Sequence, residues 1–194
     1  MISADQIKEL REKTSAGISD VKKALEESGG DMNKAYAWLE RKLGSVAVKK
    51  AGREIKAGLV EAYVHSNGRI GSLVEVGCET DFVARNPQFK EFAHDIAMHI
   101  AAMSPLYLSI ETVPQNVWET EQSRIAEEIQ GLDKPSHILK EIIDGKLKVY
   151  FGALSLLSQP FIKDQDKTVG DIVNEAIGKF GENIKVGKFT RFEI

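Results

Sequence analysis

The sequence predicts an α+β fold: an N-terminal three-helix domain, then a small antiparallel three-stranded sheet packed with helices. Three observations predict it. Short apolar stripes at helical spacing, separated by glycine-containing turns, fill residues 1–45. An alternating apolar pattern then surrounds an Asn-Gly pair, which is typical of a β-hairpin. Longer helical stripes follow, and the chain closes in a strand-like run. We expect two domains, at residues 1–54, which include a basic linker, and at residues 55–194.

Capping patterns indicate where the first three helices begin. Ser3 and Gln6 form a capping-box pattern, so the first helix should start near residue 4. Ser19 is expected to cap the second helix and Asp31 the third, because both side chains can accept a backbone N–H bond. A Ser-Gly-Gly run ends the second helix, and Gly44 is expected to close the third.

The small N-terminal domain needs an anchor and a connection to the rest of the chain. Three helices this short bury few large side chains, so Trp38 is predicted to be the central anchor. The basic segment 45–53 reads as a linker or a frayed helix. Its Lys49, Lys50 and Arg53 could contact phosphates, although a solvated connector is the favoured interpretation.

The predicted sheet begins with strands at residues 59–65 and 70–78, joined by a turn at Asn67-Gly68. Alternate residues of the second strand share one face. This pattern makes Cys78 a small core residue; the alternative, a reactive thiol, would require an exposed electropositive site. The closing run 184–194 should complete the sheet.

Helices are predicted to pack on this sheet. The first begins at Pro87, since proline favours the first helical position. Further helices are expected at residues 114–130, 136–144 and 168–181, with a serine or threonine cap on the last two. The strongly apolar segment 147–157 reads as a buried helix of its own.

Composition argues against several classes of protein. The chain has 26 Lys+Arg and 29 Asp+Glu, a net charge of −3, whereas dedicated nucleic-acid binders usually carry a basic excess. One cysteine cannot form an internal disulfide or a cysteine-based metal site. The polar start lacks the apolar core of a signal peptide, and no run approaches the roughly 20 apolar residues of a membrane helix. We therefore expect a cytoplasmic protein with no membrane or nucleic-acid partner.

Residue patterns typical of catalysis are missing from the sequence. His94 and His99 are five residues apart, so a straight helix would not aim both at one metal ion. A phosphate-loop look-alike at residues 181–188 is one residue too long, and Phe189 stands where serine or threonine is needed. We expect no cofactor, no metal and no small-molecule substrate.

One segment, residues 79–86, is hard to explain as part of the core. It forms the corner between a strand and a proline-started helix, and such corners often carry function. Phe82 is a large apolar side chain flanked by Asp81 and Arg85. Two interpretations stay open: Phe82 tucks under the sheet, or it is an exposed aromatic anchor for a partner.

Five short segments resemble the translation elongation factor Ts family, in the same order along nearly the whole chain. Each is modest, but the five together are highly specific. They are Leu10–Leu25, Glu79–Asn86, Ile96–His99, Gln159–Phe161 and Phe189–Phe192.

The resemblance implies a guanine-nucleotide exchange factor that binds elongation factor Tu and promotes GDP release during translation elongation. It also implies that the three-helix domain is of the ubiquitin-associated type. In the family, the Asp-Phe pair of a Thr-Asp-Phe-Val motif intrudes between helices of the GTPase and displaces elements that hold magnesium and phosphates. The corresponding residues of this chain are Thr80, Asp81, Phe82 and Val83.

The resemblance further implies that the N-terminal domain docks on the GTPase. The docking segment of the family corresponds to residues 14–19, together with Arg11 before it. Where the family has paired methionines, this chain has Ile18 and Ser19. Ile18 can still fill an apolar notch, but Ser19 offers little to it. His99, in another matching segment, is a further expected contact.

Long family members carry two related core halves and an inserted helical hairpin, whereas this chain resembles the short form with one half. Short members pair, so a homodimer is implied, with segment 147–157 or the sheet as the shared face. The main rival is a protein-binding adaptor that uses the three-helix domain. A second rival is a small enzyme in which Asp81, Arg85 and His99 converge in a cleft.

Overall fold

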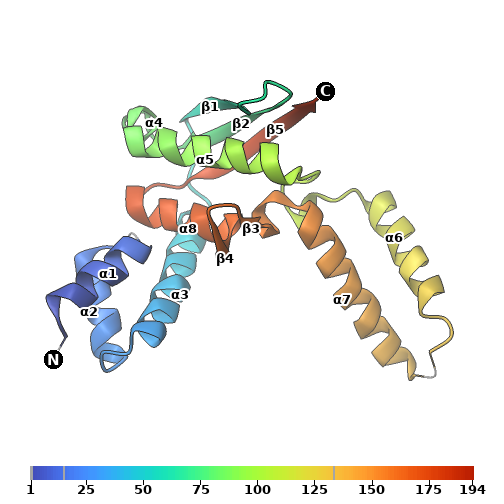
Figure 1. The fold of residues 1–194 in the computed structure, drawn as a ribbon. Helices are drawn as coiled ribbons and strands as arrows, with labels where there is room; N and C mark the ends of the chain where they lie inside the picture. The colour runs from blue at the N-terminus through green and yellow to red at the C-terminus, as the bar shows by residue number, and fades with distance from the viewer. Residues whose placement is uncertain (1, 15, 133) are drawn as a thin grey trace. The chain divides into compact units, whose positions relative to one another are not determined.

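The computed structural model describes residues 2–14, 16–132 and 134–194 (Figure 1). The chain forms two compact units: Met1–Ala101 with Gly170–Ile194, and Ala102–Val169. Eight α-helices and five strands are assigned within the described residues. The α+β class and the small antiparallel three-stranded sheet are therefore confirmed. The predicted domain boundary after residue 54 stays a prediction.

The first unit begins with three helices, α1 (Ala4–Thr14), α2 (Ile18–Glu27) and α3 (Met32–Lys50). The predicted capping box is present: the Ser3 N–H donates to Gln6 Oε1 at 2.9 Å, and the Gln6 N–H donates to Ser3 Oγ at 3.1 Å. Asp31 also caps α3 as predicted, accepting from two backbone N–H groups. The core of the three helices consists of Leu10, Ala16, Val21, Ala24, Leu25, Ala35 and Leu39.

Two expectations for these helices were wrong at the level of single residues. Gly17, not Ser19, is the N-cap of α2, and α2 begins at Ile18. Trp38 is half-buried at the edge of the domain instead of central, because its indole N–H donates to Glu27 at 2.7 Å near the surface. An indole N–H needs such a polar partner, and the aliphatic core does not supply one.

The third helix also continues past Gly44, so the expected linker at residues 45–50 is helical. The buried stripe of α3 continues through Leu43 and Ala47, which fall at four-residue spacing from Leu39. Leu43 contacts α8 so closely at Gly178 that a side chain there would clash. Burial of Leu43 and Ala47, on either side of Gly44, outweighs the helix penalty of that glycine, which is about 1 kcal/mol.

The sheet of the first unit has the strand order β1-β2-β5, with both pairs antiparallel. The strands are β1 (Ala57–Val64), β2 (Ile70–Cys78) and β5 (Lys185–Glu193). Gly68 turns the β1–β2 hairpin with a φ of 66°, as the Asn-Gly signal predicts. Alternate β2 residues are buried as predicted, and Cys78 is completely buried.

Two helices of the first unit complete this core: α5 (Pro87–Met103) and α8 (Val169–Phe180). The hydroxyl of Ser72 on β2 donates to the carbonyl of Ala97 on α5 at 2.6 Å, which fixes the helix on the sheet. Helix α5 begins at Pro87, and α8 ends at Phe180, directly before Gly181, whose φ is 73°. Both limits agree with the prediction.

The second unit contains an antiparallel helical pair, α6 (Gln115–Glu128) and α7 (Ser136–Leu154). Short 3-10 turns lie at Ile110–Thr112 and Leu156–Ser158, and a two-stranded hairpin consists of β3 (Pro160–Phe161) and β4 (Asp164–Thr168). Trp118 stacks on Phe151 across the helical pair, with ring centroids 4.8 Å apart. Ile125 and Leu147 complete the buried contact.

The sequence misplaced several limits in this unit. Helix α7 does not end before Gly145, and 147–157 is not a separate buried helix; its first eight residues are the second half of α7. Only one stripe of that segment is buried, since Leu147 is inaccessible while Val149 is 75% exposed. Helices α6 and α7 thus form a helical hairpin, which the sequence analysis did not predict. The β3–β4 hairpin was not predicted, because its strands are short and its sequence is polar.

No helix within the described residues combines the length and the apolar character that are needed to span a bilayer.

Candidate functional site

The corner between β2 and α5 contains a short helix, α4 (Asp81–Arg85), that presents an aromatic side chain to solvent. Phe82 is 85% exposed, the highest exposure among the aromatic side chains of the described residues. None of the five residues of α4, all of them described, is buried. The structure therefore answers the question that the sequence left open: Phe82 does not tuck under the sheet.

Asp81 and Arg85 lie on the exposed surface of α4 beside Phe82. Their side chains form an ion pair of 3.1 Å one helical turn apart, with 60% and 80% of each side chain exposed. An exposed pair of this kind contributes little to stability because solvent screens it. The pair leaves Phe82 as an apolar side chain with one acidic and one basic neighbour on the same short helix.

The base of the corner, in contrast, is firmly tied to the fold. Thr80, the N-cap residue of α4, donates its backbone N–H and its hydroxyl to the Glu182 carboxylate at 3.0 and 2.6 Å. The thiol of Cys78 donates to the Thr80 carbonyl oxygen at 3.1 Å. Burial, together with the nearby charge of Glu182, raises the pKa of Cys78 above its ordinary value. Cys78 is thus a protonated structural donor, which agrees with the core interpretation of this residue.

The predicted docking residues lie at the turn between α1 and α2. Arg11, Ser19 and Ile18 are exposed, with Ile18 at 48%. Thr14 shapes this turn: its hydroxyl donates to the Leu10 carbonyl at 2.7 Å and accepts from the Ala16 N–H at 3.3 Å. Ser15, inside the predicted docking segment, lies outside the described residues.

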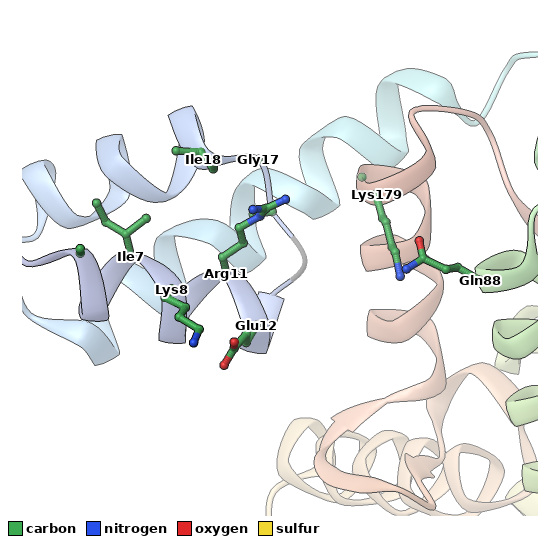
Figure 2. A pocket seen from close by; sticks show the side chains of 11 residues that line it. Ile7, Lys8, Arg11, Glu12, Gly17, Ile18, Gln88 and Lys179 are labelled. Atoms are coloured by element: carbon green, nitrogen blue, oxygen red, sulfur yellow. The ribbon is translucent and has the colours of Figure 1, made fainter.

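Arg11 and Ile18 line an open surface hollow of about 750 Å³ (Figure 2). Figure 2 shows Ile7, Lys8 and Arg11 projecting from α1 on the wall of this hollow. The wall combines apolar groups with three cationic residues and one acidic residue, Glu12. Because cationic groups predominate, its chemistry suits a partner that offers an apolar side chain with an acidic neighbour. Ser19, although exposed, is not among the residues that line the hollow.

His99 has a different position from the other predicted contacts. Its side chain is completely buried on α5, which leaves it no surface to offer a partner in this conformation. The difference in burial also separates His99 from the exposed Asp81 and Arg85. The three side chains do not form the shared cleft that the enzyme interpretation requires.

Metal ligation and phosphate contacts have no support in the described part of the chain. No group of three or more His, Cys, Asp or Glu side chains among the described residues is placed to hold a metal ion. Arg53, considered above as a phosphate contact, instead pairs with Glu79 at 3.4 Å. Lys188 of the phosphate-loop look-alike lies within β5, not at the start of a helix, where phosphates bind.

One important residue of the corner was missed by the sequence analysis. Glu182 follows α8 and is separated from Thr80 by 102 positions. No periodicity or motif marks it, because its contact with the corner is a tertiary contact between residues far apart in the sequence. Its location directly after a helix-ending glycine indicated a loop, but gave no hint of the partner.

Comparison with known proteins agrees with these features. A family model described as elongation factor TS matches residues 3–194. An elongation factor Ts of Thermotoga petrophila is 53% identical over 193 residues, which is 100% of this chain and 96% of that protein. Elongation factors Ts of Rubrobacter xylanophilus (48% over 190 residues; 98% of this chain, 97% of the relative) and Carboxydothermus hydrogenoformans (50% over 194 residues; 100% and 89%) are also similar.

These matches identify a translation elongation factor, a protein that acts in protein biosynthesis. More specifically, the chain belongs to the elongation factor Ts family.

Proposed function

We propose that the chain is a guanine-nucleotide exchange factor that binds elongation factor Tu and promotes the release of GDP. The observation that carries this proposal is the exposure of Phe82, at 85%, on a corner whose base is hydrogen-bonded to the fold. A large exposed ring on a fixed support is the arrangement expected of an anchor that enters a partner. Membership of the elongation factor Ts family supports the choice of partner.

The mechanism follows from thermodynamic linkage. An exchange factor that binds the nucleotide-free GTPase more tightly than the GDP form must weaken GDP binding by the same ratio. It needs no contact with GDP, because differential contact with two states of the GTPase is sufficient. No bond is made or broken in this process. The protein would therefore act without a catalytic residue, metal or cofactor of its own, in the cytoplasm.

The residues of α4 fit the part of a wedge. Phe82 offers a large apolar area with few rotatable bonds, so little conformational entropy is lost when it is inserted. Asp81 can accept hydrogen bonds in the partner or repel nearby anions once its pair with Arg85 is broken. Because that pair is exposed, breaking it requires little free energy. Thr80 and Val83 flank Asp81 and Phe82 in the chain, and Thr80 is hydrogen-bonded to Glu182.

The turn between α1 and α2 would supply a second, docking contact. Arg11 and Ile18 line one hollow, where Arg11 offers a positive charge and Ile18 an apolar side chain to the partner. Ser19 lies beside Ile18 without lining that hollow, so we assign most of the docking free energy to Ile18. The two contacts would have different roles: the docking contact supplies affinity for the partner, and insertion of Phe82 weakens its binding of GDP.

The test of this proposal is the rate of GDP release from elongation factor Tu, measured with a fluorescent GDP in the presence and absence of this protein. The proposal requires a faster release that saturates with the concentration of the chain. Binding without acceleration would instead favour the adaptor interpretation, in which the three-helix domain only holds a partner. No binding would reject both.

We also propose that the protein is a homodimer that pairs through the outer face of the sheet. This face carries exposed apolar side chains on all three strands, and the register places Val64 and Phe192 on either side of Gly71. Their exposed fractions are 67% and 64%, and Leu73 beside them is 43% exposed. A contiguous apolar area of this kind is expected at an interface. Segment 147–157 is the weaker candidate, since its buried stripe already packs inside the helical hairpin.

The mass of the free protein in solution tests this second proposal. Light scattering should give twice 21.5 kDa for the wild type. Phe192→Glu should yield monomers, while Val149→Glu, a matched change on the exposed side of α7, should leave the dimer intact. The reverse pattern would move the interface to α7, and a monomeric wild type would reject the homodimer.

A further inference from the structure

The loop between α8 and β5 contacts Glu79 and Thr80, at the base of the corner that carries Phe82. It does so through two consecutive residues, Glu182 and Asn183. The Glu182 carboxylate accepts three hydrogen bonds: from the Glu79 N–H at 3.0 Å, from the Thr80 N–H at 3.0 Å and from the Thr80 hydroxyl at 2.6 Å. In the opposite direction, the Asn183 N–H donates to Glu79 Oε1 at 2.5 Å. The two segments therefore hold each other reciprocally across more than 100 positions of sequence.

These contacts of Glu182 and Asn183 with Glu79 and Thr80, here called the clamp, are anchored in the interior of the first unit. Asn183 is 1% exposed, and its side-chain amide donates to the carbonyl of Arg53 at 2.8 Å. The guanidinium of Arg53 in turn pairs with Glu79. Ile184, the next residue, is also buried. The loop that presents Glu182 is therefore fixed on both sides, and its carboxylate is a rigid acceptor instead of a mobile surface charge.

Helix α4 needs such an external support. Its five residues are far fewer than the roughly 12 required for a helix that is marginally stable on its own. Its N-cap Thr80 makes no capping bond with its side chain, and the hydroxyl donates to Glu182. A cap residue normally stabilises the first turn from within. Here the first turn is held from outside, by the bonds of Thr80 to Glu182.

We infer that Glu182 is a positioning residue for nucleotide exchange: its carboxylate fixes the backbone of Glu79 and Thr80 so that Phe82 is presented to the partner in one orientation. The inference rests on the proposed exchange function and assigns Glu182 no contact with the partner. Three charge-assisted bonds to one carboxylate suffice for this task, because each is stronger than a neutral hydrogen bond. When the backbone beside Phe82 is already fixed, binding costs less conformational entropy than it would for a mobile corner.

The test combines exchange rates with a structural measurement on the free protein. Glu182→Ala should lower the acceleration of GDP release by about tenfold, within the range for interactions that hold an anchor residue. The same change in a Phe82→Ala background should have less than about a twofold effect, because residues that act through one another are not additive. Glu127→Ala, a change of an equally charged exposed residue on α6, should alter neither rate.

Amide hydrogen exchange measures the clamp directly. In Glu182→Ala, the Thr80 N–H should exchange at least about tenfold faster, while buried amides of β2 keep their protection. Thr80→Val removes only the hydroxyl donor and should cause a smaller loss of activity. Thr80→Ser keeps the hydroxyl and should retain the wild-type rate. If Glu182→Ala fails to fold, amide exchange of the free Thr80→Val protein decides the question, because that measurement does not depend on any contact of Thr80 with the partner.

The outcomes separate this inference from the proposed function. A wild-type chain that does not accelerate GDP release would reject the function, while the amide exchange of Glu182→Ala would still report on the clamp. If the wild type is active and Glu182→Ala is equally active, the positioning role is wrong. It is also wrong if Glu182→Ala has the same effect with and without Phe82, or if the Thr80 amide keeps its protection.

Discussion

Phe82 and Phe89 lie seven positions apart and have opposite environments. Phe89, on α5, is 0% exposed and packs edge-to-face on Phe180 with ring centroids 5.7 Å apart. Phe82, on α4, is 85% exposed. The same side chain thus serves stability at one position and is available for binding at the other. The contrast allows the two roles to be separated by experiment.

Replacement of each ring by alanine should affect stability very differently. Phe89→Ala should lower the free energy of unfolding by about 3–5 kcal/mol, since it leaves a cavity in the core. Phe82→Ala should change it by less than about 0.5 kcal/mol, as for other surface substitutions. Chemical denaturation of the two variants checks this. A large loss of stability in Phe82→Ala would mean that the ring packs against its own chain.

The docking contact should be sensitive to charge at Ile18. Ile18→Asp places a carboxylate where an apolar side chain lines the hollow, so the affinity for elongation factor Tu should fall by about tenfold or more. The fold should be unaffected, because Ile18 is already 48% exposed. Val48→Asp, a change of an exposed apolar residue on α3, is the control and should bind normally. Titration calorimetry compares the two, and equal affinities would reject the docking role.

The helical pair of the second unit should lose stability in acid. The hydrogen bond from Arg124 holds the pKa of Glu121 below its ordinary value of 4.5, and the bond from Lys146 does the same for Glu128. A carboxyl group with a lowered pKa stabilises the fold above its unfolded pKa, and this contribution is lost as the pH falls through the folded value. Stability should therefore be constant near pH 6–7 and decline below about 4.5.

Thermal unfolding of Glu121→Gln provides the comparison. The variant should be less stable than the wild type at pH 7, because it loses the charged pair. The difference between the two should shrink as the pH falls below 4.5. A difference that is the same at pH 7 and pH 3 would contradict the assignment to this carboxylate.

Cys78 should be inert towards thiol reagents in the native protein. Its side chain is completely buried, and burial raises the pKa of the thiol above 9.0, so little thiolate forms at neutral pH. Ellman's reagent should modify it only slowly, and stoichiometrically once denaturant is added. Fast modification of the native protein would indicate that the end of β2 opens readily, and with it the support of α4.

Local signals in the sequence were sufficient for much of the fold. The Asn67-Gly68 turn, the alternation in β2 and the caps at Ser3 and Asp31 depend on residues a few positions apart, and all were predicted. Glycine was less informative, because its effect depends on tertiary contacts. Gly44 was expected to end a helix and does not, since burial of Leu43 beside it and of Ala47 on the next turn outweighs its propensity.

The candidate site was predictable only in part. The motif around Phe82 could be found by resemblance, but its exposure could not, since a one-turn helix has no periodicity to indicate a buried side. Glu182 could not be found at all, because its partner Thr80 lies 102 positions away. The burial of His99 follows from the packing of α5, which the local motif does not reveal.

The most direct measurement of the central claim is the rate of GDP release from elongation factor Tu with Phe82→Ala, compared with the wild type at equal folded concentration. Loss of the exposed ring should reduce the acceleration by about 1–3 kcal/mol in transition-state terms, or roughly 5- to 150-fold. Asp81→Ala should have a smaller effect. A Phe82→Ala protein that releases GDP as fast as the wild type would contradict the account.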